Sequence, residues 1–196
     1  MPAERKTMRK VHYVEELTPA ETYDMAMSIV APRLVAWVST YNSDESVNIA
    51  PYAMSGVVSI NPLIVEFCSI GKKDTYFNAM DRKAFGFNIP SQRHKELVIT
   101  SAKPLKRNES EAEQCGIHTR KGEKVDAPVI ELTQASFECE VIDTKEIGES
   151  TIVYGAVKAI HTAEGLVSPE GFADFAQLNP LTKLGGNQWG TTEAFV

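Results

Sequence analysis

Short blocks of apolar and polar residues alternate along the first part of the chain, and they predict strands joined by turns. Residues 34–40 are rich in β-branched and aromatic side chains and predict a strand. Residues 42–45 form a polar turn cluster, and residues 47–50 predict a short return strand. We therefore expect a hairpin over residues 34–50. Pro51 lacks a backbone N–H and marks an edge or a loop.

The same patterns predict further strands and a few helices. We expect a short strand at residues 11–14 and longer ones at 63–69, 84–89, 136–142 and 150–161, the last two joined through Gly148. We expect helices at residues 19–28, 75–82 and 92–101, because each follows a capping residue, namely Thr18, Asp74 and Ser91.

Many short strands with few helices favour a mainly β fold, a barrel or a sandwich, over layers of alternating strands and helices. No glycine-rich GxGxxG lies between a strand and a helix, so a Rossmann dinucleotide site is not supported. The length of 196 residues fits a single domain, 1–196. Within it, residues 1–17 form a polar lead-in. Residues 102–126 are polar, carry a helix signal only near 109–115, and predict a long loop or lid.

Charge and composition narrow the class of partner. The formal net charge of −6 argues against a general nucleic-acid binder, because binding a phosphate backbone needs an excess of Lys and Arg. No apolar run reaches the length of a membrane span, and the charged N-terminus does not resemble a signal peptide. The three cysteines are widely spaced, without a CxxC pair, which favours reduced thiols in a cytoplasmic protein.

Two stretches carry candidate chemistry. In residues 69–78, hydroxyl groups, the backbone beside Gly71, Lys73 and a helix start could surround a phosphate. A solvated turn with a helix cap is the alternative. In residues 48–59, a proline-containing loop could lay backbone amides beside a flat heteroaromatic ring, or it could be an ordinary strand connection.

Outside these stretches the signals are weaker. His161 at a strand end is either a satisfied histidine or an approach to a ligand, and Trp189 is either a packing anchor or a group delivered to a ligand or partner subunit. The four histidines have no metal-ligand spacing, and no nucleophile–base pair stands out. If the protein is an enzyme, a cofactor is therefore expected to supply the chemistry.

Several segments, taken in order, resemble one known family. Residues 31–40 resemble its "PRPxAWVST" segment, residues 48–53 its "NxAPYS", residues 59–62 its "SxxPP", and residues 71–78 its "GxxKDTxxN". Residues 154–161 resemble its "GEVVAIH" strand, and residues 181–186 its "PLxRLGG" ending. Together these segments resemble the flavin reductase and flavoredoxin family of FMN-binding split barrels.

The resemblance implies a Greek-key split β-barrel with peripheral helices. It also implies a homodimer with FMN near the subunit interface. Carried over by position, the residues of the FMN site would be Ser39, Thr40, Asn48, Tyr52, Ala53, Met54, Ser55, Ser59, Ser69, Lys73, Asp74, Thr75 and Asn78, with His161 and Trp189 as approaches to the flavin. Among them, residues 39–40 and 73–75 would lie near the phosphate or ribityl chain, and residues 52–55 would border the ring.

Three hypotheses follow. The first is an FMN-dependent oxidoreductase that takes a hydride from NADH or NADPH to the bound flavin. The second is an FMN-binding electron carrier without its own nicotinamide reaction. The third is a small-molecule binding or structural barrel without flavin.

Overall fold

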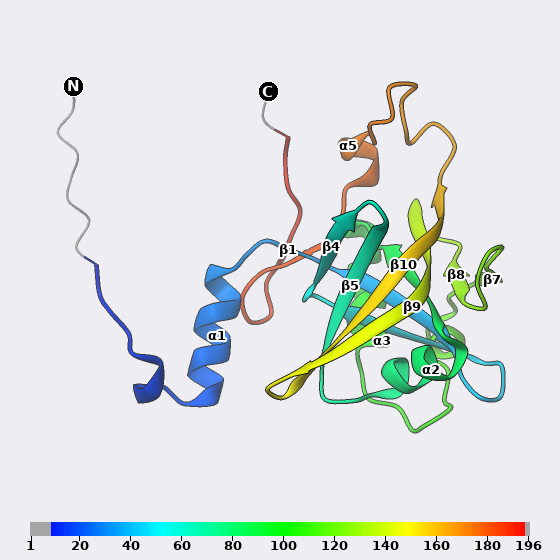
Figure 1. The fold of residues 1–196 in the computed structure, drawn as a ribbon. Coiled ribbons are helices and arrows are strands. Elements are labelled where there is room, and N and C mark those ends of the chain that lie inside the picture. Colours follow the sequence, from blue (N-terminus) through cyan, green and yellow to red (C-terminus); the bar gives the residue numbers. More distant parts are fainter. Residues whose placement is uncertain (1–8, 195–196) are drawn as a thin grey trace, which may run out of the picture.

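A curled antiparallel sheet organises the computed structural model, which describes residues 9–194 (Figure 1). Across the sheet, the strands follow the order β3 (Val47–Tyr52), β2 (Ala36–Tyr41), β6 (Ala84–Ile89), β9 (Ala135–Ile147), β10 (Ser150–Thr162), β5 (Leu63–Ile70) and β4 (Ser55–Ile60). Each neighbouring pair is antiparallel. The sheet curls far enough to bring β3 into contact with β5, which confirms the mainly β barrel.

Short strands and helices surround this sheet. The short strands are β1 (Arg33–Leu34), β7 (Thr119–Lys121), β8 (Pro128–Ile130), β11 (Thr182–Lys183) and β12 (Trp189–Gly190). The helices are α1 (Pro19–Ile29), α2 (Asp74–Arg82), α3 (Lys95–Ser101), α4 (Glu111–Cys115) and α5 (Phe175–Leu178), with 3-10 turns η1 (Val14–Glu16) and η2 (Gln92–His94).

The two faces of β2 contribute to two separate cores. Ala36 and Val38 point into the barrel, where Phe67 and Phe85 pack edge to face with ring centroids 5.1 Å apart. Trp37, next along the strand, points the other way into a second core, which α3 and α4 cover. We call this second cluster the outer core. This division follows from the alternation of side chains along a strand. Because α4 covers the outer core, it lies against β3, beside the first hairpin.

Most predicted elements are present, with shifts at their ends. The predicted hairpin is confirmed as β2–β3, and the proline at position 51 sits within β3, an edge strand, where its missing N–H costs no ladder bond. The loop expected at residues 48–59 was wrong in part. Strand β3 continues to Tyr52 and β4 begins at Ser55, so only Ala53 and Met54 separate them. Strands β9 and β10 both run longer than predicted, and Gly148, with φ 58°, lies in their turn.

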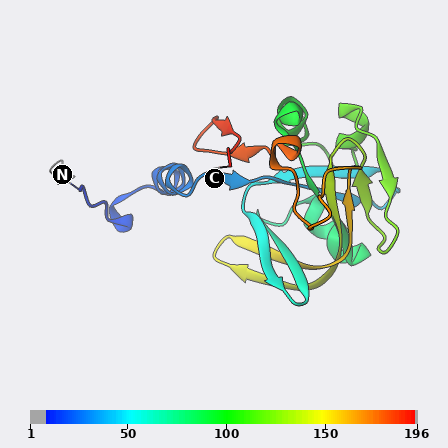
Figure 2. The same ribbon diagram turned by 90° about the horizontal axis from the view of Figure 1, so that it is seen from above.

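Two local predictions were wrong. The strand expected at residues 11–14 is absent, and the 3-10 turn η1 begins at Val14 instead. This segment lies away from the sheet, as Figures 1 and 2 show, so no strand is available to pair with it. Asp74 is the first residue of α2 rather than its cap, because the helix begins one residue earlier than predicted. The first eight residues of the predicted lead-in lie outside the described residues.

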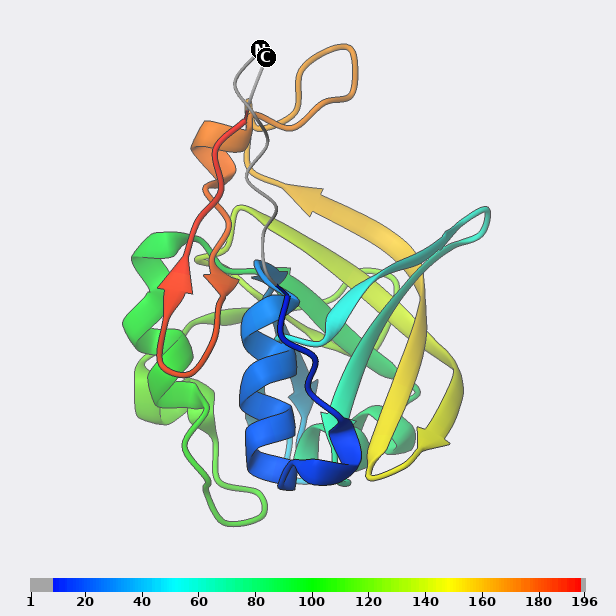
Figure 3. The same ribbon diagram turned by 90° about the vertical axis from the view of Figure 1, so that its left-hand side faces the viewer.

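Helix α1 projects from the barrel in Figure 2, lies in front of it in the view of Figure 3, and buries none of its residues. The predicted capping residue, Thr18, is confirmed. Its side chain accepts from the Glu21 N–H, and the Glu21 carboxylate accepts from the Thr18 N–H, which makes a capping box at the start of α1. Its other end is tied to the body. The Arg33 guanidinium donates to the carbonyl oxygens of Val30, at 2.7 Å, and of Leu184, at 3.0 Å. The helix is therefore anchored at its base, and its residues are exposed or half-buried.

Candidate functional site

A buried polar network joins the ends of β2 and β3 to the first turn of α2. The Asn48 side-chain oxygen accepts hydrogen bonds from the hydroxyl groups of Thr75, at 2.8 Å, and Thr40, at 3.2 Å. The Asn78 amide donates to Thr40 Oγ1 at 3.3 Å and to Asn42 Oδ1 at 2.7 Å. All five side chains are buried. Four of them were predicted as site residues, and the structure brings those four together.

A cavity of about 440 Å³ opens beside this network. Strand β3, the start of α2, the end of α3 and the segment that follows it, and α4 provide its walls. Its lining residues are Asn48, Ala50, Pro51, Tyr52, Lys73, Asp74, Thr75, Ser101, Ala102, Lys103, Pro104, Leu105 and Glu111. Five predicted site residues, Asn48, Tyr52, Lys73, Asp74 and Thr75, are among them.

The start of α2 gives one wall of the cavity a positive character. Backbone N–H groups in the first turn of a helix have no partner within the helix, and the helix dipole favours an anion there. Lys73 caps α2 without a side-chain cap bond, and its ammonium group has no ion-pair partner among residues 9–194. The Asp74 carboxylate is paired with Arg107 at 2.9 Å. This wall can therefore hold an anion such as a phosphate.

Glu111 is a buried residue of the cavity lining that sequence reasoning missed. It lies at the start of α4, inside the segment predicted as a loop or lid, and only 8% of it is exposed. Its Oε2 atom accepts from Asn48 Nδ2 at 2.9 Å and from the backbone N–H of Ile49 at 3.0 Å. Burial raises the pKa of the carboxyl group, although these hydrogen bonds lower it in part. The only sequence signal was the weak helix pattern near residues 109–115.

Tyr52 and Ser69 continue the barrel side of the site. Tyr52 is 7% exposed and packs against Phe67, with ring centroids 4.7 Å apart. Burial raises the pKa of its phenol, and hydrogen bonds with Thr75 and Ser69 partly offset this. The Ser69 hydroxyl also donates to the carbonyl oxygen of Gly71 at 2.7 Å, so it tightens the turn that leads into α2.

The remaining predicted residues on β2 and β4 and in the turn after β3 do not belong to the cavity lining. Ala53 and Met54 form the turn after Tyr52, and the Ser55 hydroxyl donates to the Tyr52 carbonyl oxygen at 3.2 Å. Ser59 lies further along β4 and is half-buried. Ser39 does not join the network, because its hydroxyl donates to the Pro128 carbonyl oxygen at 2.6 Å on the side covered by β8.

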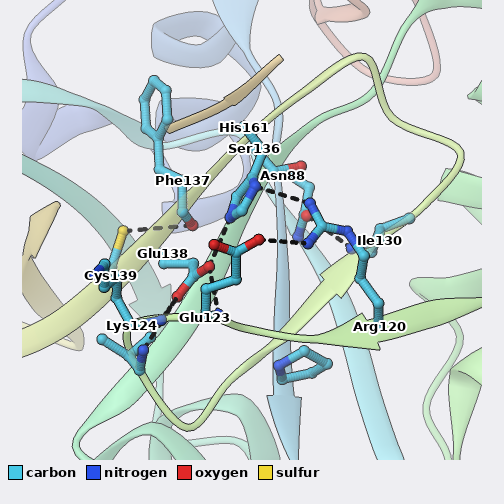
Figure 4. Close-up of polar contacts among 12 residues, drawn as sticks. Asn88, Arg120, Glu123, Lys124, Ile130, Ser136, Phe137, Glu138, Cys139 and His161 are labelled. Atoms are coloured by element: carbon cyan, nitrogen blue, oxygen red, sulfur yellow. Dashed lines mark hydrogen bonds and ion pairs between the residues drawn. The ribbon is translucent and has the colours of Figure 1, made fainter. Parts of the chain in front are cut away.

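His161 belongs to a second polar network, shown in Figure 4, and it does not belong to the cavity lining. Its Nε2 lies 2.6 Å from Glu138 Oε1, and its Nδ1 lies 2.8 Å from Arg120 Nη2. Because a guanidinium can only donate, Nδ1 accepts, and Nε2 carries the proton given to Glu138. The Glu138 carboxylate also accepts the backbone N–H groups of residues 123–125. The predicted His161 therefore helps to hold Glu138, and Glu138 fixes the loop at residues 123–125. We call Glu138 the anchor of this loop.

Trp189 also lies apart from the cavity lining. It is half-buried on β12, packs against the outer core, and has the Lys183 ammonium group 4.7 Å from its ring centroid. Its position agrees with the packing-anchor alternative. Neither Trp189 nor His161 joins the group of residues that the cavity brings together.

The arrangement can bind and orient an anionic ligand. Within the described residues, no three His, Cys, Asp or Glu side chains gather closely enough to hold a metal ion. None of the helices described is long and apolar enough to span a membrane. The groups gathered at the cavity are hydrogen-bond donors and acceptors and the ammonium groups of Lys73 and Lys103, which suits the positioning of a cofactor.

The chain matches known proteins over most of its length. The model of the flavin reductase like domain matches residues 27–180. Nitrilotriacetate monooxygenase component B from Bacillus cereus is 23% identical, covers 98% of this chain and 99% of its own, and has a TM-score of 0.92. The Pseudomonas fluorescens 2-nitrobenzoate 2-nitroreductase NbaA is 24% identical, covers 95% and 94%, and has a TM-score of 0.88.

A third structure is the FMN-binding protein from Thermus thermophilus. It is 20% identical, covers 96% of this chain and 99% of its own, and has a TM-score of 0.79. At these identities the structural likeness establishes the fold, and it confirms the predicted split barrel.

Proposed function

The chain belongs to the flavin reductase like domain family, and we propose that it is an FMN-dependent flavin oxidoreductase that takes a hydride from NADH or NADPH. The observation that carries this proposal is the cavity beside the start of α2. It combines an unpaired ammonium group, a helix N-terminus and a buried amide within one space of about 440 Å³. These are the groups expected around the phosphate of a mononucleotide.

The residues present fit FMN at both ends of this space. Lys73 and the first turn of α2, with Thr75, would hold the phosphate, and Asn48 and Asn78 would support that loop. Tyr52 and the turn formed by Ala53 and Met54 would border the ring system. An FMN-binding protein of the same fold supports this choice of cofactor.

Bound FMN would supply the redox chemistry by accepting the hydride of a reduced nicotinamide. This chain's own residues would bind the phosphate, orient the ring and limit access of water. Such a role needs no side-chain acid or base. The cavity lining supplies hydrogen-bond donors and acceptors together with the ammonium groups of Lys73 and Lys103.

We also propose that the protein is a homodimer. Helix α1 buries none of its residues, and an isolated helix of 11 residues is marginal in water, so it needs a partner surface. Strand β4 exposes Val57, Val58 and Ile60, the last of them 78% exposed. Sedimentation equilibrium should give twice the chain mass, and a monomer at micromolar concentration would contradict the proposal.

The three free thiols fit our expectation of a reducing, cytoplasmic location.

The visible spectrum of the purified protein, before and after anaerobic NADH and NADPH, tests the main proposal. We expect flavin absorbance, after addition of FMN if the cofactor is lost in purification, and bleaching by at least one nicotinamide. A flavin spectrum that neither nicotinamide changes would instead favour an electron carrier. A protein that takes up no FMN at all would overturn both readings and favour a barrel without flavin.

A further inference from the structure

We propose that Glu111 is a positioning residue that fixes the orientation of Asn48, so that this amide presents an N–H rather than an oxygen to the phosphate end of the cavity. The inference rests on the proposed FMN site and names a residue outside the segments that predicted that site. Glu111 comes from α4, whereas the residues predicted near the phosphate come from β2 and the start of α2.

The backbone N–H of Ile49 determines which atoms donate in this contact. That N–H can only donate, and it lies 3.0 Å from Glu111 Oε2. Oε2 is therefore an acceptor whether or not the carboxyl group carries a proton on its other oxygen. Oε2 carries no hydrogen in the carboxylate, or in an acid protonated on Oε1, so the Asn48 atom 2.9 Å from it is the donor, the amide nitrogen.

The other side of Asn48 agrees with this orientation. Its oxygen accepts from the Thr75 and Thr40 hydroxyl groups, and Asn78 donates to Thr40 in turn. A primary amide carries two N–H groups, and Glu111 takes one of them. Asn48 lines the cavity, and the second N–H has no partner among residues 9–194. It is therefore free to bind an oxyanion.

Without the Glu111 carboxyl group, Asn48 Nδ2 would lose the acceptor that holds the amide in this orientation. A rotated Asn48 would place its oxygen toward Ile49 and leave the two threonine hydroxyl groups facing an NH₂ group. Asn48 would then present fewer N–H donors to an anion in the cavity. The affinity for a flavin without a phosphate should not change, because the residues that would border the ring are on β3 and the turn after it.

Titrations of the full-length protein with FMN and with riboflavin test the proposal. In Glu111→Ala, we expect the Kd for FMN to rise about tenfold, as for the loss of one hydrogen bond to a charged group. We expect the Kd for riboflavin to change less than about twofold. Glu111→Gln should restore FMN binding, because its amide oxygen can accept both bonds. If Glu111→Ala does not fold, Glu111→Leu, which fills the space without an acceptor, replaces it.

A double-mutant cycle tests whether Glu111 acts through Asn48. If it does, Asn48→Ala combined with Glu111→Ala should bind FMN no more weakly than Asn48→Ala alone. Additive losses, equal losses for FMN and riboflavin, or no rescue by Gln would each overturn the proposal. A wild-type protein that binds neither flavin would instead overturn the proposed function, so the two failures are distinguishable.

Discussion

Glu111 and Glu138 are both buried carboxylates, yet the protein uses them in opposite ways. Glu111, on α4, accepts hydrogen bonds from β3, whereas Glu138, on β9, accepts them from residues 123–125. Glu138 is fully buried, and burial by itself would raise its pKa. Hydrogen bonds from the backbone of residues 123–125 and from His161 outweigh this and lower its pKa to about 2. Glu111 accepts hydrogen bonds from Asn48 and Ile49, both on Oε2, and burial raises its pKa.

The difference separates an anchor from a site. The anchor has its hydrogen-bonding capacity filled by the protein, so nothing is left for a ligand. The cavity around Glu111 keeps a free ammonium group, a helix N-terminus and an amide N–H. Groups held in this incomplete state cost stability and are typical of functional sites. The raised pKa of Glu111 and the lowered pKa of Glu138 are consistent with that division.

The largest effect is expected from removing the anchor. Glu138→Ala leaves three backbone N–H groups and the His161 N–H without their acceptor. We expect a loss of about 3–5 kcal/mol in the free energy of unfolding, measured by denaturant titration. Glu140→Ala, on the same strand but exposed and paired with Lys158, is the matched control and should cost less than about 1 kcal/mol.

The pH dependence of this effect has a definite sign. The folded pKa of Glu138 is lowered from 4.5 to about 2, so its contribution is present above pH 4.5 and is lost as the pH falls toward 2. The advantage of the wild type over Glu138→Ala should therefore shrink in acid. A difference in stability that stays constant from pH 7 to pH 3 would contradict the anchor role.

The sequence predicts the strands of the fold better than the contacts between distant residues. Strands β2, β5, β6 and β10 follow from local apolar and β-branched patterns, because each pattern is contained within its own segment. Strand β4 was missed, because Gly56 and Ser59 interrupt its apolar pattern and its pairing with β5 is a tertiary contact. Pattern reasoning has no access to such pairing.

The site shows the same limit. Thr40, Asn48, Thr75 and Asn78 were predicted from family-like segments, and the fold brings them into one network. Glu111 was not predicted, because it is one of many acidic residues in a polar segment and reaches Asn48 across 63 positions of sequence. Whether a carboxylate is an anchor or part of a site depends on which distant donors the fold supplies.

The next largest effect is expected on FMN binding, and it distinguishes a lysine that lines the cavity from a neighbour that does not. Lys73→Ala should weaken FMN binding by about 1.5–3 kcal/mol, or roughly 10- to 150-fold in Kd, because it removes a charge-assisted contact to the phosphate. Lys72→Ala is the matched control, since this neighbour is paired with Glu146 at 2.5 Å and does not line the cavity. Equal Kd values for the two variants in a fluorescence titration would remove Lys73 from the phosphate site.

The smallest effect concerns the stability of the ligand-free protein and is expected to have the opposite sign to that of Glu138. Burial raises the folded pKa of Glu111 above 4.5, so its favourable contribution is complete below pH 4.5 and is lost as the pH rises through the folded pKa. Glu111→Gln keeps an acceptor for Asn48 and Ile49 without this loss. Its unfolding free energy should therefore increase relative to the wild type between pH 4.5 and pH 8.

Glu113→Gln, an exposed change on the same helix, controls for the removal of one negative charge from α4. If it stabilises the protein as much as Glu111→Gln does, the gain comes from the net charge of the helix and not from the buried carboxylate. If Glu111→Gln instead destabilises the protein at pH 8, Glu111 is an anchor of the same kind as Glu138, and the contrast between the two residues fails.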